Sequence, residues 1–121
     1  MNIIRNNSQP RLSACVTYCD LIFLSGQTPK SSEDDIALQT REVLAKIDGL
    51  LAAAGSDNRY ILSAQVWLKN ISRDFAEFND VWVDWLPEGH SPARTAVQAE
   101  MARSDILVEG AASLCTQSGA A

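Results

Sequence analysis

Hydrophobic and polar positions first follow the two-residue period of β-strands. Short apolar or alternating runs occur at residues 2–5, 13–18, 21–25 and 61–68. Bounded by turn formers such as residues 26–32 (GQTPKSS), these runs predict strands. Residues 6–10 (NNSQP) are predicted to be a turn. The second and third strands are expected to form an antiparallel hairpin around Cys19 and Asp20.

The period becomes helical from Asp34 or Asp35 onward. Apolar residues then recur at intervals of three and four, which predicts one buried stripe; they are Ile36, Val43, Leu44, Ile47, Leu50 and Leu51. The two aspartates suit the N-terminal end of a helix, and Gly55 suits its C-terminal stop.

A second helix is predicted to begin near Ser72 and Asp74 and to end before Pro87. Its apolar face is largely aromatic: Phe75, Phe78, Trp82, Trp85 and Leu86. Such a stripe indicates core packing or an oligomer contact more than a ligand box. Asn79 borders it; a polar amide there is usually solvated, and becomes more interesting if another subunit packs on it.

Residues 91–110 contain a run with strand-like alternation, 95–99, and an apolar run, 106–108, separated by the polar segment 102–105. A hairpin folded there would place Arg94 opposite Glu109 on the neighbouring strand. Three interpretations remain open for this pair: a satisfied ion pair, a surface cross-strand pair, or two halves of a carboxylate site. Spacing alone favours the structural interpretations, because cross-strand opposite charges commonly stabilise sheets.

The predicted order is strand, strand, strand, helix, strand, helix, strand, strand. It indicates an α+β fold in which two helices cover one face of a mixed sheet. The chain is expected to be a single domain, residues 1–121, with a frayed tail at 116–121. Strands such as residues 21–24 carry apolar side chains at successive positions, which point to opposite faces of the sheet. The face without helices is therefore also expected to be buried against other protein. A homo-oligomer would supply it.

Composition narrows the class of function. The 121 residues are 46% hydrophobic and 21% charged, as in ordinary globular domains. The net charge of -5 and the scattered cations argue against nucleic acid as a partner. No signal peptide or membrane span is predicted, and three cysteines without a Cys-x-x-Cys pattern suit a reducing cytoplasm. With His90 the only histidine, a zinc site is not expected.

The segment Pro92-Ala93-Arg94-Thr95-Ala96-Val97, followed by a strand ending in Leu107-Val108-Glu109, resembles the signature of the Rid (YjgF) family of enamine/imine deaminases. The Leu24-Ser25-Gly26-Gln27 loop, the helix at 40–55 and the run Phe75-Ala76-Glu77-Phe78-Asn79 match the family in the same order. The resemblance extends over roughly residues 12–113.

This resemblance implies a chorismate-mutase-like fold and a homotrimer with clefts between subunits. It implies hydrolysis of small 2-imino acids, such as 2-iminopropanoate, to the 2-keto acid and ammonia, without metal or organic cofactor. Arg94 would hold the substrate carboxylate with its planar fork. Glu109 would orient or deprotonate water, or shuttle protons to the leaving amine.

Four further positions are carried over as substrate-binding: Ser25 and Gly26 in the pocket-lining loop, Asn79 near the cleft, and the backbone around Ala96, where the family often has Cys. Leu12 stands where the family commonly has an aromatic residue, and Gly110-Ala111-Ala112 replaces a bulkier run after the acid.

Three functions are therefore compared. The deaminase is favoured, a non-catalytic trimer that binds small carboxylates or a protein is the alternative, and a ribonuclease is disfavoured by the acidic charge.

Overall fold

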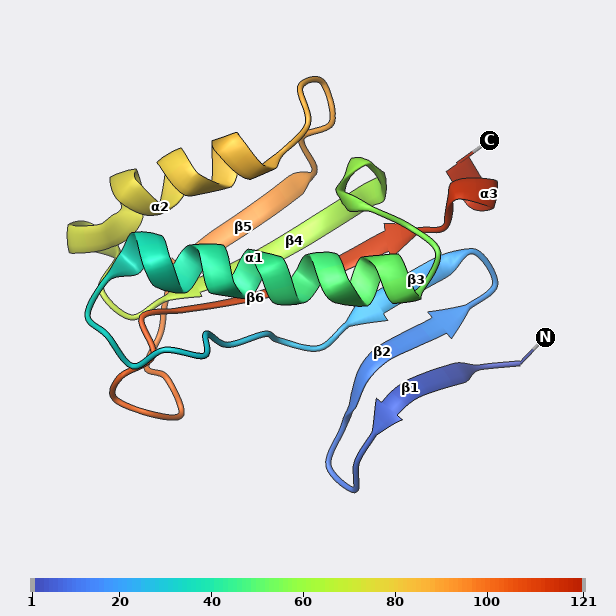
Figure 1. The fold of residues 1–121 in the computed structure, drawn as a ribbon, viewed down its shortest axis with the longest axis horizontal. Helices are drawn as coiled ribbons and strands as arrows, with labels where there is room; N and C mark the ends of the chain where they lie inside the picture. Colours follow the sequence, from blue (N-terminus) through green and yellow to red (C-terminus); the bar gives the residue numbers. More distant parts are fainter. Residues whose placement is uncertain (1, 121) are drawn as a thin grey trace.

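The sheet and two long helices form two layers in the computed structural model, which describes residues 2–120 (Figure 1). Six strands form one mixed sheet in the order β1-β2-β3-β6-β4-β5. The strands are β1 (Ile4–Ser8), β2 (Ser13–Tyr18), β3 (Leu21–Leu24), β4 (Ile61–Leu68), β5 (Ala93–Gln98) and β6 (Val108–Cys115). Both long helices, α1 (Ile36–Ala53) and α2 (Ile71–Trp85), pack on the same face. The predicted α+β fold is confirmed.

The helices begin where polar side chains cap them. The carboxylate of Asp35 accepts from the Leu38 N–H at 3.1 Å, and the amide of Asn70 accepts from the Arg73 N–H at 3.1 Å. Gly55 follows α1 with φ 77°, a conformation that favours glycine. The first helix therefore has its predicted limits, whereas α2 begins slightly earlier than expected because Asn70, not Ser72, is its cap.

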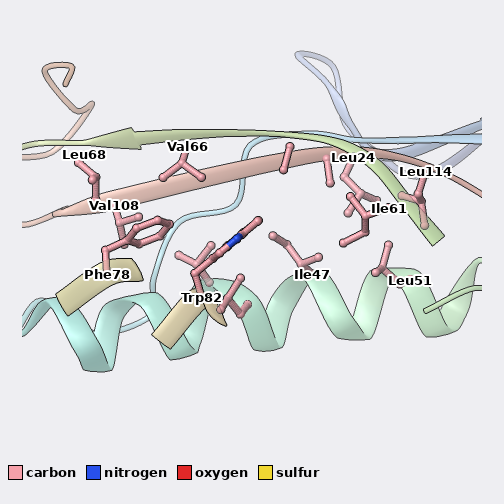
Figure 2. Close-up of a cluster of buried hydrophobic side chains, with 14 of the residues drawn as sticks. Leu24, Ile47, Leu51, Ile61, Val66, Leu68, Phe78, Trp82, Val108 and Leu114 are labelled. Carbon is pink, nitrogen blue, oxygen red and sulfur yellow. The ribbon is translucent and has the colours of Figure 1, made fainter. Parts of the chain in front are cut away.

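The core fills the space between the helices and the sheet. Figure 2 shows side chains of both long helices and of β3, β4 and β6 converging there, among them Ile47, Phe78, Trp82, Val66 and Val108. Trp82 stacks on Phe78 and is tilted against Trp85, with ring centroids 6.0 and 5.4 Å away. The aromatic stripe of α2 is thus mainly core, as predicted.

The ends of the chain differ from the sequence predictions. Residues 6–8, expected in a turn, belong to β1, and the turn lies at residues 9–12, where the Gln9 N–H donates to the Leu12 carbonyl at 2.7 Å. Asn7 is accommodated with φ 53°, which asparagine tolerates. Where a frayed tail was predicted, Gln117–Ala120 form one helical turn, α3; residue 121 lies outside the described residues. A short 3-10 helix, η1 (Asn58–Tyr60), also precedes β4.

The predicted hairpin between β5 and β6 is wrong, because β4 lies between them. β4 pairs parallel with β5 and antiparallel with β6. Residues 99–107 therefore cross the end of β4 instead of making a tight turn. Nine residues readily span two inter-strand spacings, roughly 10 Å in total. Ile106 and Leu107 are buried in this connection, and only Val108 of that apolar run lies in a strand.

Gln39 fastens the connection to α1. Its side chain is fully buried and makes three hydrogen bonds: Nε2 donates to the carbonyls of Glu33 and Asp105 at 2.8 and 2.9 Å, and Oε1 accepts from the Leu107 N–H at 2.8 Å. This amide joins the loop before α1 to the loop before β6.

Replacing Gln39 by leucine should lower the free energy of unfolding by about 2–4 kcal/mol, because it leaves buried backbone groups without partners at ~1–3 kcal/mol each. Chemical denaturation at fixed protein concentration measures this loss. Arg41→Ala, on the exposed side of the same helix, is the matched control and should change stability by less than about 0.5 kcal/mol. Equal effects of the two substitutions would contradict the role given to Gln39.

Candidate functional site

The sheet has one face covered by helices and one open face. Side chains of directly paired residues point to the same side of a sheet, and successive residues of a strand alternate. Ala64, Val66 and Leu68 are buried under the helices, so Ser63, Gln65 and Trp67 mark the open face. Leu21 and Phe23 of β3 also lie there, 41% and 44% exposed. Within one chain, nothing among residues 2–120 covers this face.

Arg94 lies on the helix side of edge strand β5. It pairs with Ala64, and its Nη1 donates to Oδ1 of Asn79 on α2 at 2.8 Å. The unit β4-α2-β5 explains this contact, because the crossover helix returns over the parallel pair. The predicted side chain Asn79 is thus in direct contact with the predicted anchor. Ala96, two residues along, faces the same side and packs against the core.

Three aromatic rings surround the Arg94 guanidinium. Its Cζ lies 5.7, 5.6 and 5.4 Å from the ring centroids of Phe75, Phe78 and Trp82. Burial lowers the pKa of Arg94 from its ordinary value, although an arginine remains protonated in proteins. Among residues 2–120, no carboxylate forms an ion pair with it. Its positive charge is therefore held by rings and one amide oxygen, with further N–H donors left for an anion.

Glu109 lies on the opposite face. It pairs with Trp67 on β4 and is half-buried on the open face. A Cβ added at Gly26 would lie 2.2 Å from Oε2 of Glu109, so the carboxylate sits directly against the glycine backbone. Two backbone hydrogen bonds between Gln27 and Gly110, at 2.7 and 3.1 Å, hold this loop beside β6.

Ser25 completes the loop. Its N–H donates to the Ala14 carbonyl at 3.0 Å, and the Gln27 amide donates to the Ser25 carbonyl and hydroxyl at 3.0 and 3.2 Å. Ser25, Gly26 and Glu109 thus form one group, whereas Arg94, Asn79 and Ala96 form another.

The two groups do not meet within one chain. Arg94 and Glu109 are separated by β4, differ by three residues along the strands and point to opposite faces. Standard strand spacings put their Cα atoms roughly 14 Å apart. The prediction that Arg94 lies directly opposite Glu109 is wrong, because β4 lies between β5 and β6. An intramolecular Arg94–Glu109 ion pair is also excluded, so each group forms half of a candidate site.

A Gly26→Ala substitution should reduce the imine hydrolysis expected from the family resemblance about 10- to 100-fold. The added methyl would meet the flexible end of Glu109, so the carboxylate would swing away while the backbone stayed in place. Steady-state kinetics together with a melting curve separates lost activity from lost stability. Gly49→Ala is the matched control, since its Cβ would meet nothing within 4 Å. Full activity in Gly26→Ala would contradict the placement of Glu109 in the site.

Sequence reasoning missed two features of these groups. It favoured core packing or an oligomer contact over a ligand site for Phe75 and Trp82, whereas both also contact the Arg94 guanidinium. It also gave no role to Trp67, although that residue lies on the same face of an alternating strand as Ser63 and Gln65. This alternation already indicated that the Trp67 side chain lies outside the core.

Two kinds of feature are not found among residues 2–120. No group of three or more histidine, cysteine, aspartate or glutamate side chains within residues 2–120 is arranged to hold a metal ion. Over the same part of the chain, no helix has the length and apolar character needed to cross a membrane.

Comparisons with known proteins agree over nearly the whole chain. The family model described as endoribonuclease L-PSP matches residues 5–113. A RutC family protein of Haemophilus influenzae is 37% identical over 110 residues, covering 90% of this chain and 94% of that protein. A YjgF family protein of Neisseria meningitidis, NMB1025, has a crystal structure with a TM-score of 0.92 at 39% identity, covering 97% of each chain. A protein of Acinetobacter baylyi named 3-aminoacrylate deaminase RutC is 29% identical over 96 residues, covering 74% of this chain and 75% of that protein.

Proposed function

Because the chain belongs to the endoribonuclease L-PSP family, the Rid/YjgF group, we propose that it is a deaminase that hydrolyses small 2-imino acids to 2-keto acids and ammonia. The observation that supports this most is Arg94, a half-buried cation ringed by aromatics that no carboxylate within residues 2–120 neutralises. The relative named a 3-aminoacrylate deaminase supports the same class of chemistry.

The proposed site forms between two copies of the chain. One copy contributes Arg94, Asn79 and Ala96 at its β5 edge, and the other contributes Ser25, Gly26 and Glu109 from its open face. A homotrimer, as the family resemblance implies, would repeat this contact three times in a closed ring. It would also cover the exposed apolar residues of the open face, including Leu21 and Phe23.

Each half has a separate task in the reaction. The Arg94 fork binds the substrate carboxylate with parallel hydrogen bonds, which fixes the imine carbon in the cleft. Glu109 accepts a proton from the attacking water as the C–O bond forms. Glu109 returns this proton to the nitrogen, which completes the tetrahedral carbinolamine. Glu109 then takes the proton of the adduct's hydroxyl as the C=O bond forms and passes it to the nitrogen, the C–N bond breaks, and ammonia leaves. Because imines hydrolyse readily in water, positioning and these two proton transfers suffice.

A competition assay tests this proposal. 2-Iminopropanoate is generated in situ from an amino acid, and the surviving imine is trapped with semicarbazide in the presence and absence of protein. Loss of trapped imine that scales with protein concentration is expected. No acceleration across several 2-imino acids would contradict the proposed reaction.

A non-catalytic trimer that binds small carboxylates is the second candidate. Leu12, an apolar side chain that is 49% exposed, favours it, because the family commonly has an aromatic residue at this position. In that case 2-keto acids would bind through Arg94 and no imine would be consumed. An endoribonuclease, as the family description reads, is disfavoured by the net charge of -5, since RNA binding needs a positive surface.

A further inference from the structure

Three rows of side chains cross the open face over β6, β4 and β5. Paired residues define each row, because directly opposite positions point to the same side. The rows are Glu109-Trp67-Val97, Ala111-Gln65-Thr95 and Ser113-Ser63-Ala93.

Only the row that contains Glu109 carries large apolar side chains; the other two are small or polar. Trp67 is the one aromatic residue in these three strands, and it is not part of the core cluster. Val97, beyond it on the edge strand, is 44% exposed. An apolar patch therefore begins one strand away from the acid.

The other flank of Glu109 is closed. On the β3 side, its carboxylate already lies against Gly26, which leaves no room for even a methyl group there. Cβ atoms of directly paired residues lie only about 5 Å apart, so the indole begins within contact distance of a group bound at Glu109. A substrate side chain bound at Glu109 would therefore extend away from Gly26, toward Trp67.

We propose that Trp67 and Val97 form the subsite for the substrate's side chain and select 2-imino acids whose side chains are bulky and apolar. This inference rests on the proposed function, which places the imine carbon at Glu109. With the carboxylate held by Arg94 of the other copy, the remaining substituent of that carbon lies along the row. Burying its methylene groups against indole and valine favours a long apolar chain over a methyl group.

Trimer packing alone is the competing explanation for Trp67. Phe23 provides the matched comparison, because it is also an aromatic residue on the open face, 44% exposed, but pairs with Ser113, four positions along β6 from Glu109. If the open face only packs against another copy, Trp67→Ala and Phe23→Ala should act alike. If Trp67 contacts substrate, only its removal should change the ranking of ligands.

The test is binding of two product acids, 2-oxopropanoate and 2-oxo-4-methylpentanoate, measured by titration calorimetry on the wild type and both variants. The wild type is expected to bind the branched acid about tenfold more tightly, since three added carbons are partly buried. Trp67→Ala should reduce that ratio to about one, and Phe23→Ala should leave it unchanged. Val97→Ser, at an exposed edge position, should lower the ratio about twofold and provides a second reading if Trp67→Ala does not fold.

Three outcomes would overturn the subsite: a wild-type ratio near one, an unchanged ratio in Trp67→Ala or Val97→Ser, or an equal change in Phe23→Ala. Imine turnover measured in parallel separates this inference from the reaction. Ratios as expected without turnover would refute the deaminase and leave the subsite standing. Absence of binding to both acids would overturn the subsite, and absence of both binding and turnover would refute both proposals.

Discussion

Arg94→Lys is expected to lower kcat/KM for 2-iminopropanoate about 100-fold. Lysine keeps the positive charge but loses the planar fork that makes two parallel hydrogen bonds to a carboxylate. It also cannot keep the guanidinium arrangement with Phe75, Phe78 and Trp82, whose centroids lie within 5.7 Å of Cζ. Losing a charge-assisted hydrogen bond costs about 1.5–3 kcal/mol, and 1.4 kcal/mol corresponds to tenfold.

The control for this variant is Arg59→Lys. Arg59 also lies near an aromatic ring, 5.1 Å from the centroid of Tyr60, but pairs with Asp57 on the exposed surface. Its replacement should leave kcat/KM within about twofold, because exposed ion pairs contribute little. If Arg94→Lys retains wild-type kinetics, Arg94 is not the carboxylate anchor.

Glu109→Gln is expected to reduce kcat by about 10²–10³ while the Kd for 2-keto acids changes less than about threefold. Glutamine has nearly the same shape as glutamate and fits against Gly26, but it cannot accept and return a proton. General acid–base groups contribute about 10²–10⁴ to rates. The semicarbazide-trapping assay measures kcat, and titration calorimetry on the same preparation measures the Kd.

Glu77→Gln, at an exposed position of α2, is the control and should retain full turnover. Wild-type kcat in Glu109→Gln would show that another group relays the proton. A parallel loss of binding and turnover would instead indicate that Glu109 holds the ligand.

Local pattern was enough to predict most of the fold. The strand at residues 61–68 and the helix capped at Asp35 lie where alternation and threes-and-fours spacing put them. Both patterns reflect which side chains are buried within a single strand or helix, so they can be recognised without knowing how the elements pair. The strand order was not recoverable in the same way. Residues 95–99 and 106–108 look like neighbours in sequence, but nothing local records that β4 inserts between them.

The candidate site was predicted in part, and for a different reason. The resemblance supplied Arg94, Asn79, Gly26 and Glu109, and the structure brings them together as two pairs on opposite faces of the sheet. The chemistry that these side chains can perform follows from their residue types. Which of them lie together depends on strand pairing between segments that are far apart in the sequence. Gln39 and Trp67 went unassigned because a buried amide and an open-face indole have roles only once their neighbours are known.

The shared site between two copies of the chain can be tested by mixing two inactive variants. Arg94→Ala supplies an intact Glu109 half, and Glu109→Gln supplies an intact Arg94 half. After equimolar co-refolding, each site takes Arg94 from one copy and Glu109 from its neighbour, and each residue is intact in half of the copies. About one quarter of the sites are then intact, so about 25% of wild-type activity should return. Recovery near that level would establish that the site spans two subunits. No recovery, in mixtures that sedimentation shows to be trimeric, would contradict the account.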